Sequence, residues 1–343
     1  MSLQDKQWKG FHMRFAARAE VKPLIDVIKK ALVPLGVNVL LLEINTNFSF
    51  QSYPELASGD ITKEDIRELA ALCQENGISL IPLFECLGHQ GWKGSRNTIL
   101  RVFPEFDETP HIPEDSQDIY CPSWCPLHPA VNPVVFTLID ELIDAFQTEA
   151  IHLGMDEVFV IADDDCPRCS GKDPSELFAK AVNDYHDYFV KEKGLEMLIW
   201  GDRLIDRKSF PVYDQWEADK FGIAPALALI PKDIIICDWH YFARDDYPSV
   251  RQFLEQGFRV WPACWRIPHA ALDFYFKSKK AWQETGARER MLGMLVTGWN
   301  ASGESLNAAL LGEDDYDPAK DPGQIKDIAE TLRTVMVVLN QAE

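Results

Sequence analysis

The alternation of short apolar segments with longer helical segments constrains the fold of this chain more than any other feature. Eight apolar runs rich in β-branched and aromatic residues recur, and the intervals between them carry helical signals. Such alternation is typical of parallel sheets with right-handed crossovers, and eight units predict an α/β fold closed into a single (β/α)8 TIM barrel. The expected strands are 11–16, 38–44, 79–85, 150–154, 196–200, 234–239, 258–264 and 292–299.

Helical signals and composition support one domain over residues 1–343. The tetrapeptide Thr62-Lys63-Glu64-Asp65 starts a helical run that ends before Gly77, and Pro133 opens another that extends to about Phe146. No Gly/Ser-rich linker divides the sequence. An open doubly wound sheet is the main alternative, but no Gly-rich nucleotide-binding motif follows the first expected strand.

The interval between the third and fourth expected strands differs from the others. Residues 86–133 are rich in Pro and are interrupted before their helix begins. Long loops in compact domains are usually functional or disordered. In a barrel this enlarged loop after strand 3 lies on the C-terminal face, where active sites sit.

The charge balance argues against several classes of partner. The 54 acidic residues outnumber the 34 Lys and Arg residues, and the formal net charge of −20 repels nucleic acid and anionic membranes. The first ten residues lack an apolar signal-peptide segment, and no later segment has the roughly 18 uninterrupted apolar residues of a membrane span. We therefore expect a cytoplasmic protein, with export open if a signal peptide has been removed; the oligomeric state stays open.

Polar and aromatic residues gather at the C-terminal ends of the expected strands. Because these ends share one face of a barrel, we expect the side chains to surround a single pocket. Carboxyl groups bind sugar hydroxyls and aromatic rings pack on sugar C–H faces, so the pattern predicts a carbohydrate site. The residues are Glu43, Asn45, Glu85, His89, Asp156, Glu157, Trp200, Asp202, Asp238, Trp239, Tyr241, Trp261, Trp265, Trp299 and Asn300.

The adjacent acids Asp156 and Glu157 are the strongest catalytic candidates. Adjacent acids usually face solvent, but this pair directly follows the apolar strand 151–154, which directs it into the barrel mouth. Residues 151–158, Ile-His-Leu-Gly-Met-Asp-Glu-Val, resemble the His-x-Gly-Gly-Asp-Glu signature of family 20 β-hexosaminidases. Met155 replaces the second Gly, as a non-Gly residue does in the hexosaminidase D branch.

Further matches to this family follow in order and extend the resemblance over residues 9–311. They are Gly36-Val37-Asn38 before Glu43, Ile81-Pro82 before Gly88-His89, Ile199-Trp200-Gly201-Asp202, Trp239-His240-Tyr241 and Thr297-Gly298-Trp299.

The resemblance implies an exo-acting, retaining β-N-acetylhexosaminidase without a cofactor. In that family the acetamido oxygen of the sugar attacks its own anomeric carbon, so no protein nucleophile is needed. By motif position, Glu157 would be the acid and base, and Asp156 would hold the acetamido N–H and stabilise the oxazolinium. Because two adjacent carboxyls cannot both ionise cheaply, we expect one raised pKa in the pair.

The resemblance also implies substrate-binding residues. Tyr241 would donate a hydrogen bond to the acetamido carbonyl oxygen, and tryptophans would form the pocket walls. His152, inside a strand, is more typical of a core histidine. The predicted substrate-binding residues are Tyr241, Trp200, Trp239, Trp299, His89, Asp202, Glu43 and Arg14.

Two departures from the family pattern lie near the first expected strand. Lys9-Gly10 stands where the family has Arg-Gly, and Arg14 stands where it has Asp. The arginine is expected to bind sugar hydroxyls, and a lysine cannot reproduce its bidentate geometry. Two alternatives therefore stay open: a glycosidase of the same fold acting on a different sugar, and a catalytically inactive carbohydrate-binding barrel. The complete set Asp156, Glu157 and Tyr241 argues against the inactive barrel.

Eight cysteines are too sparse for a disulfide scaffold. Four lie in apolar patterns and are expected in the core. Four form a C-x3-C and a C-x2-C pair on neighbouring loops, where free thiols, a structural zinc and disulfides all stay open; no catalytic metal is expected. The core four are Cys73, Cys86, Cys237 and Cys264, and the paired four are Cys121, Cys125, Cys166 and Cys169.

Overall fold

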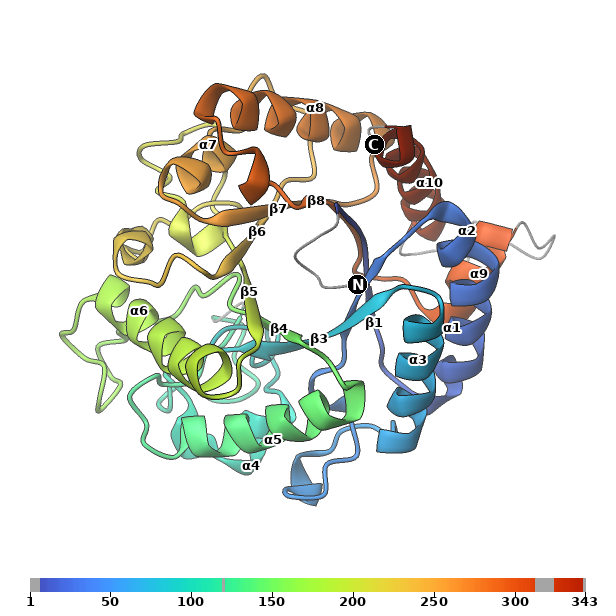
Figure 1. Cartoon of the computed structure of the whole chain (residues 1–343). Helices are drawn as coiled ribbons and strands as arrows, with labels where there is room; N and C mark the ends of the chain where they lie inside the picture. Colours follow the sequence, from blue (N-terminus) through green and yellow to red (C-terminus); the bar gives the residue numbers. More distant parts are fainter. Residues whose placement is uncertain (1–6, 119–120, 312–323, 342–343) are drawn as a thin grey trace.

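The computed structural model describes residues 7–118, 121–311 and 324–341. Its eight parallel strands form one closed barrel in sequence order, with β1 paired to both β2 and β8. Figure 1 looks along this barrel, with the helices arranged around it. The predicted (β/α)8 TIM barrel is confirmed. The strands are β1 (Trp8–Arg14), β2 (Val39–Glu43), β3 (Ser79–Cys86), β4 (Ala150–Gly154), β5 (Glu196–Trp200), β6 (Ile235–Trp239), β7 (Arg259–Cys264) and β8 (Gly293–Gly298).

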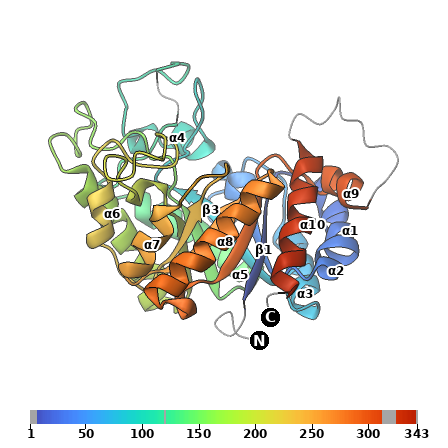
Figure 2. The ribbon, with the colours of Figure 1, turned by 90° about the horizontal axis from the view of Figure 1, so that it is seen from above.

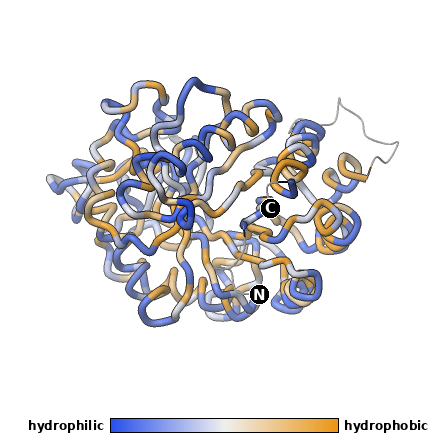
Figure 3. The backbone as a smooth tube through the Cα atoms, turned by 45° about the horizontal axis from the view of Figure 1, so that its top comes forward, coloured by the Kyte–Doolittle hydropathy of each residue, from blue (hydrophilic) through white to orange (hydrophobic). Residues whose placement is uncertain are grey.

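The helices form the outer layer. Along them the chain alternates between hydrophilic and hydrophobic residues (Figure 3), so that each can turn an apolar face toward the strands. Between β5 and β6 the described chain forms the short 3-10 helices Asp202–Leu204 and Ala224–Ala228 in place of an α-helix. No helix in the described ranges is long and apolar enough to cross a membrane. The α-helices are α1 (Val21–Val27), α2 (Val33–Leu35), α3 (Lys63–Glu75), α4 (Thr98–Val102), α5 (Val131–Phe146), α6 (Pro174–Tyr185), α7 (Pro248–Glu255), α8 (Pro268–Thr285), α9 (Gly303–Leu311) and α10 (Ile325–Gln341).

Side chains fill the barrel interior below the C-terminal rim, toward the N-terminal ends of the strands. Trp8 and Trp261 pack edge to face there, with ring centroids 4.8 Å apart. A Cβ atom on Gly10 would lie 2.1 Å from a ring carbon of Trp261, so only glycine fits beside this ring. Trp261 therefore belongs to the packed interior, and its predicted place at the rim is wrong.

Lys9 and Arg14 lie at opposite ends of β1. The Lys9 ammonium donates a hydrogen bond to Asn340 Oδ1 of α10 (2.9 Å), at the N-terminal end of the barrel. Five residues of strand separate it from Arg14 by about 16 Å. The expectation that Lys9 replaces a sugar-binding arginine is therefore wrong, whereas Arg14 reaches the C-terminal rim.

The long segment between β3 and β4 covers the C-terminal end of the barrel. It contains α4, which lies beyond the ends of the strands in Figure 2. Residues of this segment help to line the cavity described below. The predicted position of the enlarged loop is confirmed.

The predicted start of α3 is confirmed by a capping box that supports a stability prediction. Thr62 Oγ1 accepts the Asp65 N–H (3.2 Å), and Asp65 Oδ2 accepts the Thr62 N–H (2.9 Å). We expect Thr62→Ala to lower the free energy of unfolding by about 1 kcal/mol, because the Asp65 N–H loses its hydroxyl acceptor. Urea denaturation measures this loss. Thr62→Ser keeps the hydroxyl and should retain most of the stability; equal losses in both variants would contradict the capping role.

Candidate active site

A cavity of about 750 Å³ opens at the C-terminal end of the barrel. This volume is within the range of small-molecule sites. Side chains at the ends of seven strands, all except β5, and from the long β3–β4 segment line it. Eight of the ten predicted site residues are among them: Arg14, Glu43, His89, Asp156, Glu157, Trp239, Tyr241 and Trp299.

The turn after β4 places the two adjacent acids in the cavity. Gly154, Met155 and Glu157 have φ angles of +64°, +72° and +47°, so the chain turns sharply through the left-handed region. This conformation favours glycine, which explains the Gly-Gly of the family pattern. Met155 adopts it at a cost, and its fully buried side chain packs in the core and offsets that cost.

Gly88 allows the β3–β4 segment to approach this turn closely. A Cβ atom at Gly88 would lie 2.8 Å from the carbonyl oxygen of Asp156. The next residue, His89, has a φ angle of +53° and points its ring at both acids. Its Nε2 lies 3.2 Å from Asp156 Oδ2 and 3.4 Å from Glu157 Oε2. His89 is therefore placed to bridge the two carboxyl groups.

The charges of this group follow from burial and proximity. Burial alone would lower the pKa of His89, but the Asp156 carboxylate raises it well above the ordinary histidine value. Burial likewise opposes ionisation of Asp156, yet the His89 charge holds the pKa of Asp156 below its usual value. The site thus holds an imidazolium beside an ionised Asp156 near neutral pH.

Glu85, at the end of β3, is the carboxyl with a raised pKa beside Asp156. Burial raises its pKa well above the ordinary value, and the charge of Asp156 adds to the shift. The sequence predicted a raised pKa within the Asp156–Glu157 pair. The structure instead brings a third carboxyl against Asp156, because β3 and β4 are neighbours in the barrel.

Glu43 organises the side of the cavity formed by β1 and β2. Its Oε1 accepts hydrogen bonds from Arg14 Nε (3.1 Å) and Asn45 Nδ2 (2.9 Å), and its Oε2 lies 3.4 Å from His12 Nε2. Burial alone would raise the pKa of Glu43, but His12 and Arg14 lower it, so the carboxylate stays charged. Arg14 is half-exposed and keeps its remaining donors toward the cavity.

Trp200 lies beneath the cavity and not in its wall. It is fully buried, with its ring centroid 4.5 Å from that of His152 and 5.5 Å from that of Trp299. His152 Nδ1 accepts the Gly154 N–H (3.0 Å), and burial lowers the pKa of His152 to about 3. Both residues therefore support the floor, and the interpretation of His152 as a core histidine is confirmed.

Asp202 also lies beneath the cavity, under Glu157. Its Oδ2 accepts the Glu157 N–H (2.9 Å) and the Arg203 Nε–H (2.6 Å), and its Oδ1 accepts Trp239 Nε1 (3.3 Å). Asp202 thus positions an acid and an aromatic residue of the cavity from below.

Aromatic side chains form the wall opposite β1 and β2. Trp239 and Tyr241 stack with centroids 4.9 Å apart, and Trp265 packs against Tyr241. The Tyr241 hydroxyl accepts a hydrogen bond from Trp299 Nε1 (2.7 Å), so its own O–H points to other acceptors. Burial raises the pKa of Tyr241 well above the ordinary value, and the hydroxyl stays protonated.

The long β3–β4 segment supplies cavity residues that sequence reasoning missed. Arg96 is buried; its Nε donates to Asp107 Oδ2 (2.7 Å), while Nη1 and Nη2 find no hydrogen-bond partner among the described residues. A single arginine in a long loop carries no sequence signal that would single it out. The other missed residues of this segment in the cavity are Trp92, Asn97, Thr98 and Arg101.

Asp238 points away from the cavity, contrary to the prediction. Successive side chains of a strand point to opposite faces of the sheet. The Asp238 side chain extends from the outer face of β6 toward α7, where its Oδ2 accepts a hydrogen bond from the Ser249 hydroxyl (2.7 Å). His240 Nε2 lies 3.2 Å from Asp238 Oδ1, and His240 Nδ1 lies 2.9 Å from Glu217 Oε1. These residues form a buried charged network outside the barrel.

The four paired cysteines do not converge as one set. Cys125, Cys166 and Cys169 meet in the core of the neighbouring loops, but Cys121 lies apart with its Sγ 3.8 Å from the Gly91 carbonyl oxygen. Glu108 takes the fourth place beside the three thiols. A site of four thiolates, as the spacing suggested, is therefore excluded by the fold.

Comparisons with known proteins agree with this fold and with the family resemblance. Residues 41–308 match the family model "Glycosyl hydrolase family 20, catalytic domain". A lacto-N-biosidase of Bifidobacterium bifidum is 25% identical over 199 residues, which cover 54% of this chain and 17% of that protein. A beta-hexosaminidase of Akkermansia muciniphila is 25% identical over 187 residues, covering 47% of this chain and 36% of that protein. The matches thus span less than half of either relative.

Among solved structures, a chitobiase of Flavobacterium johnsoniae superposes with a TM-score of 0.63 at 18% sequence identity. The superposition covers 99% of this chain and 54% of that one, and it shows a shared fold. The family match, which extends from β2 into α9, confirms the resemblance found in the sequence.

The buried network of His240 predicts a pH-dependent stability. Burial alone would lower the pKa of His240, but Asp238 and Glu217 raise it to about 9. A raised histidine pKa stabilises the fold fully below the unfolded value of 6.5 and loses that contribution as the pH rises through about 9. Between these pH values, the free energy of unfolding should fall by up to about 3 kcal/mol more in the wild type than in His240→Gln. Urea denaturation at both pH values measures the difference, and parallel pH profiles would contradict a buried imidazolium.

Proposed function

The chain belongs to glycosyl hydrolase family 20 and is a glycoside hydrolase domain, and from its cavity we propose that it releases a terminal β-linked N-acetylhexosamine. The reaction would retain the anomeric configuration and proceed through an oxazolinium formed by the substrate's own acetamido group. One observation carries this proposal: Asp156, Glu157 and the Tyr241 hydroxyl line a single cavity.

Asp156 is suited to hold the acetamido N–H and to stabilise the oxazolinium. Asp156 is nearly fully buried, and His89 holds its pKa low. Its carboxylate is therefore already negatively charged beside the position where the positive oxazolinium would form. In a buried site such a fixed charge acts more strongly than in water. As the acetamido oxygen bonds to C1 and the C1–O bond to the leaving group breaks, the N–H gains positive character beside this carboxylate.

Glu157 is suited to transfer the proton in both steps. It would give its proton to the leaving oxygen, and then accept a proton from the water that attacks C1 and opens the oxazolinium ring. Its carboxyl group lies at the cavity wall, near the Nε2 of His89, while Asp202 fixes its main chain. The side chain can therefore reach the substrate while its backbone stays in place.

The aromatic wall suits an acetamido group. The Tyr241 hydroxyl accepts the Trp299 indole N–H, so its own O–H can donate to the acetamido carbonyl oxygen in place of its contact with Thr297. A donor at this point orients the carbonyl oxygen for attack on C1. Trp239 and Trp299 line the same region with apolar rings, against which the acetamido methyl can pack.

Arginines and a carboxylate supply partners for the sugar hydroxyls. Glu43 and Arg14 form one charged pair at the cavity, and the free Nη atoms of Arg96 lie in the β3–β4 segment that also lines it. We assign these groups to the non-reducing end of the sugar. There they would bind the sugar hydroxyls, the role that the family resemblance gives to an arginine at position 9.

The first test of the proposed function compares aryl glycosides of different sugars. The protein should release the aryl group from β-N-acetylglucosaminides or β-N-acetylgalactosaminides, and not from the corresponding glucoside or galactoside, because these lack the acetamido oxygen. Colorimetric release of the aryl alcohol measures the rates. Release from the plain glucoside would overturn the acetamido mechanism, and absence of release from all four would favour a binding protein.

Two substitutions separate the roles of the acids. Glu157→Gln should lower kcat about 10²–10⁴-fold on a natural disaccharide, because the leaving oxygen loses its proton donor. The loss should be much smaller on an activated aryl glycoside, whose leaving group needs no proton. Asp156→Asn should lower kcat on both substrates. Near-normal disaccharide hydrolysis by Glu157→Gln would show that another group is the acid.

A further inference from the structure

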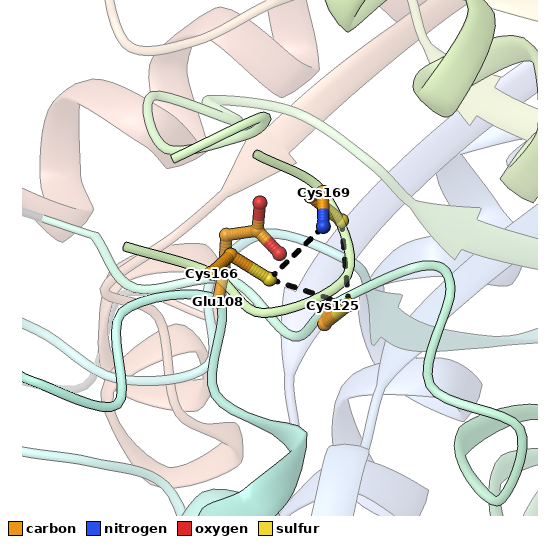
Figure 4. Close-up of side chains that lie close together, drawn as sticks. All are labelled: Glu108, Cys125, Cys166 and Cys169. Atoms are coloured by element: carbon orange, nitrogen blue, oxygen red, sulfur yellow. Dashed lines mark hydrogen bonds between the residues drawn. The ribbon is translucent and has the colours of Figure 1, made fainter. Parts of the chain in front are cut away.

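Four buried side chains from two neighbouring loops lie close together (Figure 4), and none of them lines the cavity described above. Two come from the long β3–β4 segment and two from the loop between β4 and α6, and their ligand atoms all lie within 4.8 Å of one another. All are at most 1% exposed. We name them the Cys3Glu cluster, which comprises Glu108, Cys125, Cys166 and Cys169.

The distances in the Cys3Glu cluster match tetrahedral coordination. Cys125 Sγ lies 3.3 Å from Cys169 Sγ and 3.6 Å from Cys166 Sγ. A tetrahedral Zn²⁺ with Zn–S bonds of about 2.3 Å separates its sulfur ligands by about 3.8 Å. These two separations are within about half an ångström of that value, and all four ligand atoms lie within 4.8 Å of one another, so small shifts of the side chains would let them reach one ion.

The backbone around the cysteines supports thiolate ligands. The Cys169 N–H points at Cys166 Sγ (3.4 Å), a donor within the C-x2-C turn that favours a negatively charged sulfur. The prolines Pro126 and Pro167, each directly after a cysteine, lack an N–H and leave the following amides to turn toward the sulfur.

Glu108 is a buried carboxyl group whose described partners are the Asp163 N–H and the neighbouring thiols. Its side chain is fully buried; Oε1 accepts the Asp163 N–H (3.1 Å), and Oε2 has no hydrogen-bond partner among the described residues. No Lys, Arg or His in the described ranges forms an ion pair with it. An ionised carboxylate buried among three thiols is costly unless a cation balances its charge.

We propose that the Cys3Glu cluster binds one structural Zn²⁺. Sulfur ligands select a borderline-soft ion over Mg²⁺ or Ca²⁺, and three thiols with a carboxylate in tetrahedral positions suit Zn²⁺. Four protein ligands fill the coordination sphere and leave no position for substrate, so the ion acts through structure and not through catalysis.

The position of the cluster gives the ion a specific task. The β3–β4 segment carries His89 near its start, and the β4–α6 loop starts with Asp156 and Glu157. A metal that joins Glu108 and Cys125 of the first loop to the two cysteines of the second ties together the loops that carry the catalytic groups. The Zn²⁺ would hold His89 against the two acids.

A disulfide is the competing use of these thiols. Cys125 and Cys169 are close enough to be joined after a small movement, but this bond would take up two of the four groups and leave Cys166 and Glu108 outside it. The structure joins none of its eight cysteines, all in its described ranges, in a disulfide. Zinc satisfies all four groups at once.

Metal analysis tests the proposal directly. The full chain purified under reducing conditions should contain one zinc per chain, measured by inductively coupled plasma mass spectrometry. After removal of zinc, Co²⁺ should bind with the thiolate charge-transfer and tetrahedral d–d absorption of a sulfur-rich site. Cys166→Ser should lose this spectrum, and Glu108→Gln should weaken zinc binding at least about tenfold. Cys73→Ala, which removes a buried thiol of α3 outside the cluster, should keep full metal content.

Other outcomes would overturn the proposal. Absence of zinc in the purified chain together with no uptake of added Zn²⁺ or Co²⁺ would exclude the site. A Cys125–Cys169 disulfide that survives purification with reductant, found by mass spectrometry of a non-reduced digest, would also exclude it. If Cys166→Ser fails to fold, the zinc content and cobalt spectrum of the wild type still decide. These readouts do not depend on hydrolysis, so they stand apart from the test of the proposed function.

Discussion

Closure of the sheet between β1 and β8 is the constraint on which the rest of the molecule depends. Because all eight strands are parallel, closure brings their carboxyl ends to one rim. Arg14 and Trp299, from opposite ends of the chain, therefore line the same cavity. Backbone hydrogen bonds between the strands stabilise the barrel, so the loops can supply the residues of the site without stabilising the fold.

The rim contains strained backbone conformations and buried charged side chains. Met155, Glu157 and His89 all have left-handed φ angles, which non-glycine residues adopt only where the surrounding structure enforces them. Glu43, Glu85 and Asp156 would repel one another if all were ionised. Two features reduce this repulsion: His89 and Arg14 lie beside two of these acids, and burial raises the pKa of Glu85 and so favours its neutral form.

The two loops after β3 and β4 have to be considered together. The first brings His89 over the acids and adds Arg96 to the cavity, and the second begins with the acids themselves. Their outer parts meet again at the Cys3Glu cluster. The loops thus contact each other twice, where His89 meets the acids and at the Cys3Glu cluster. A site that depends on fixed distances between charged groups benefits from such contacts.

Apolar periodicity is a local property of the sequence, and it predicted the barrel and the strand positions. Strand-end position and the family motifs together predicted twelve of the residues that line the cavity. Tertiary structure decided the rest. Lys9 and Asp238 are on strands as expected, but strand direction and alternation place them at the wrong end or on the outer face. Glu108, and not Cys121, lies beside the other three cysteines, and Arg96 lines the cavity. Neither position could be predicted, because the path of a long loop depends on contacts distant in sequence that no local pattern encodes.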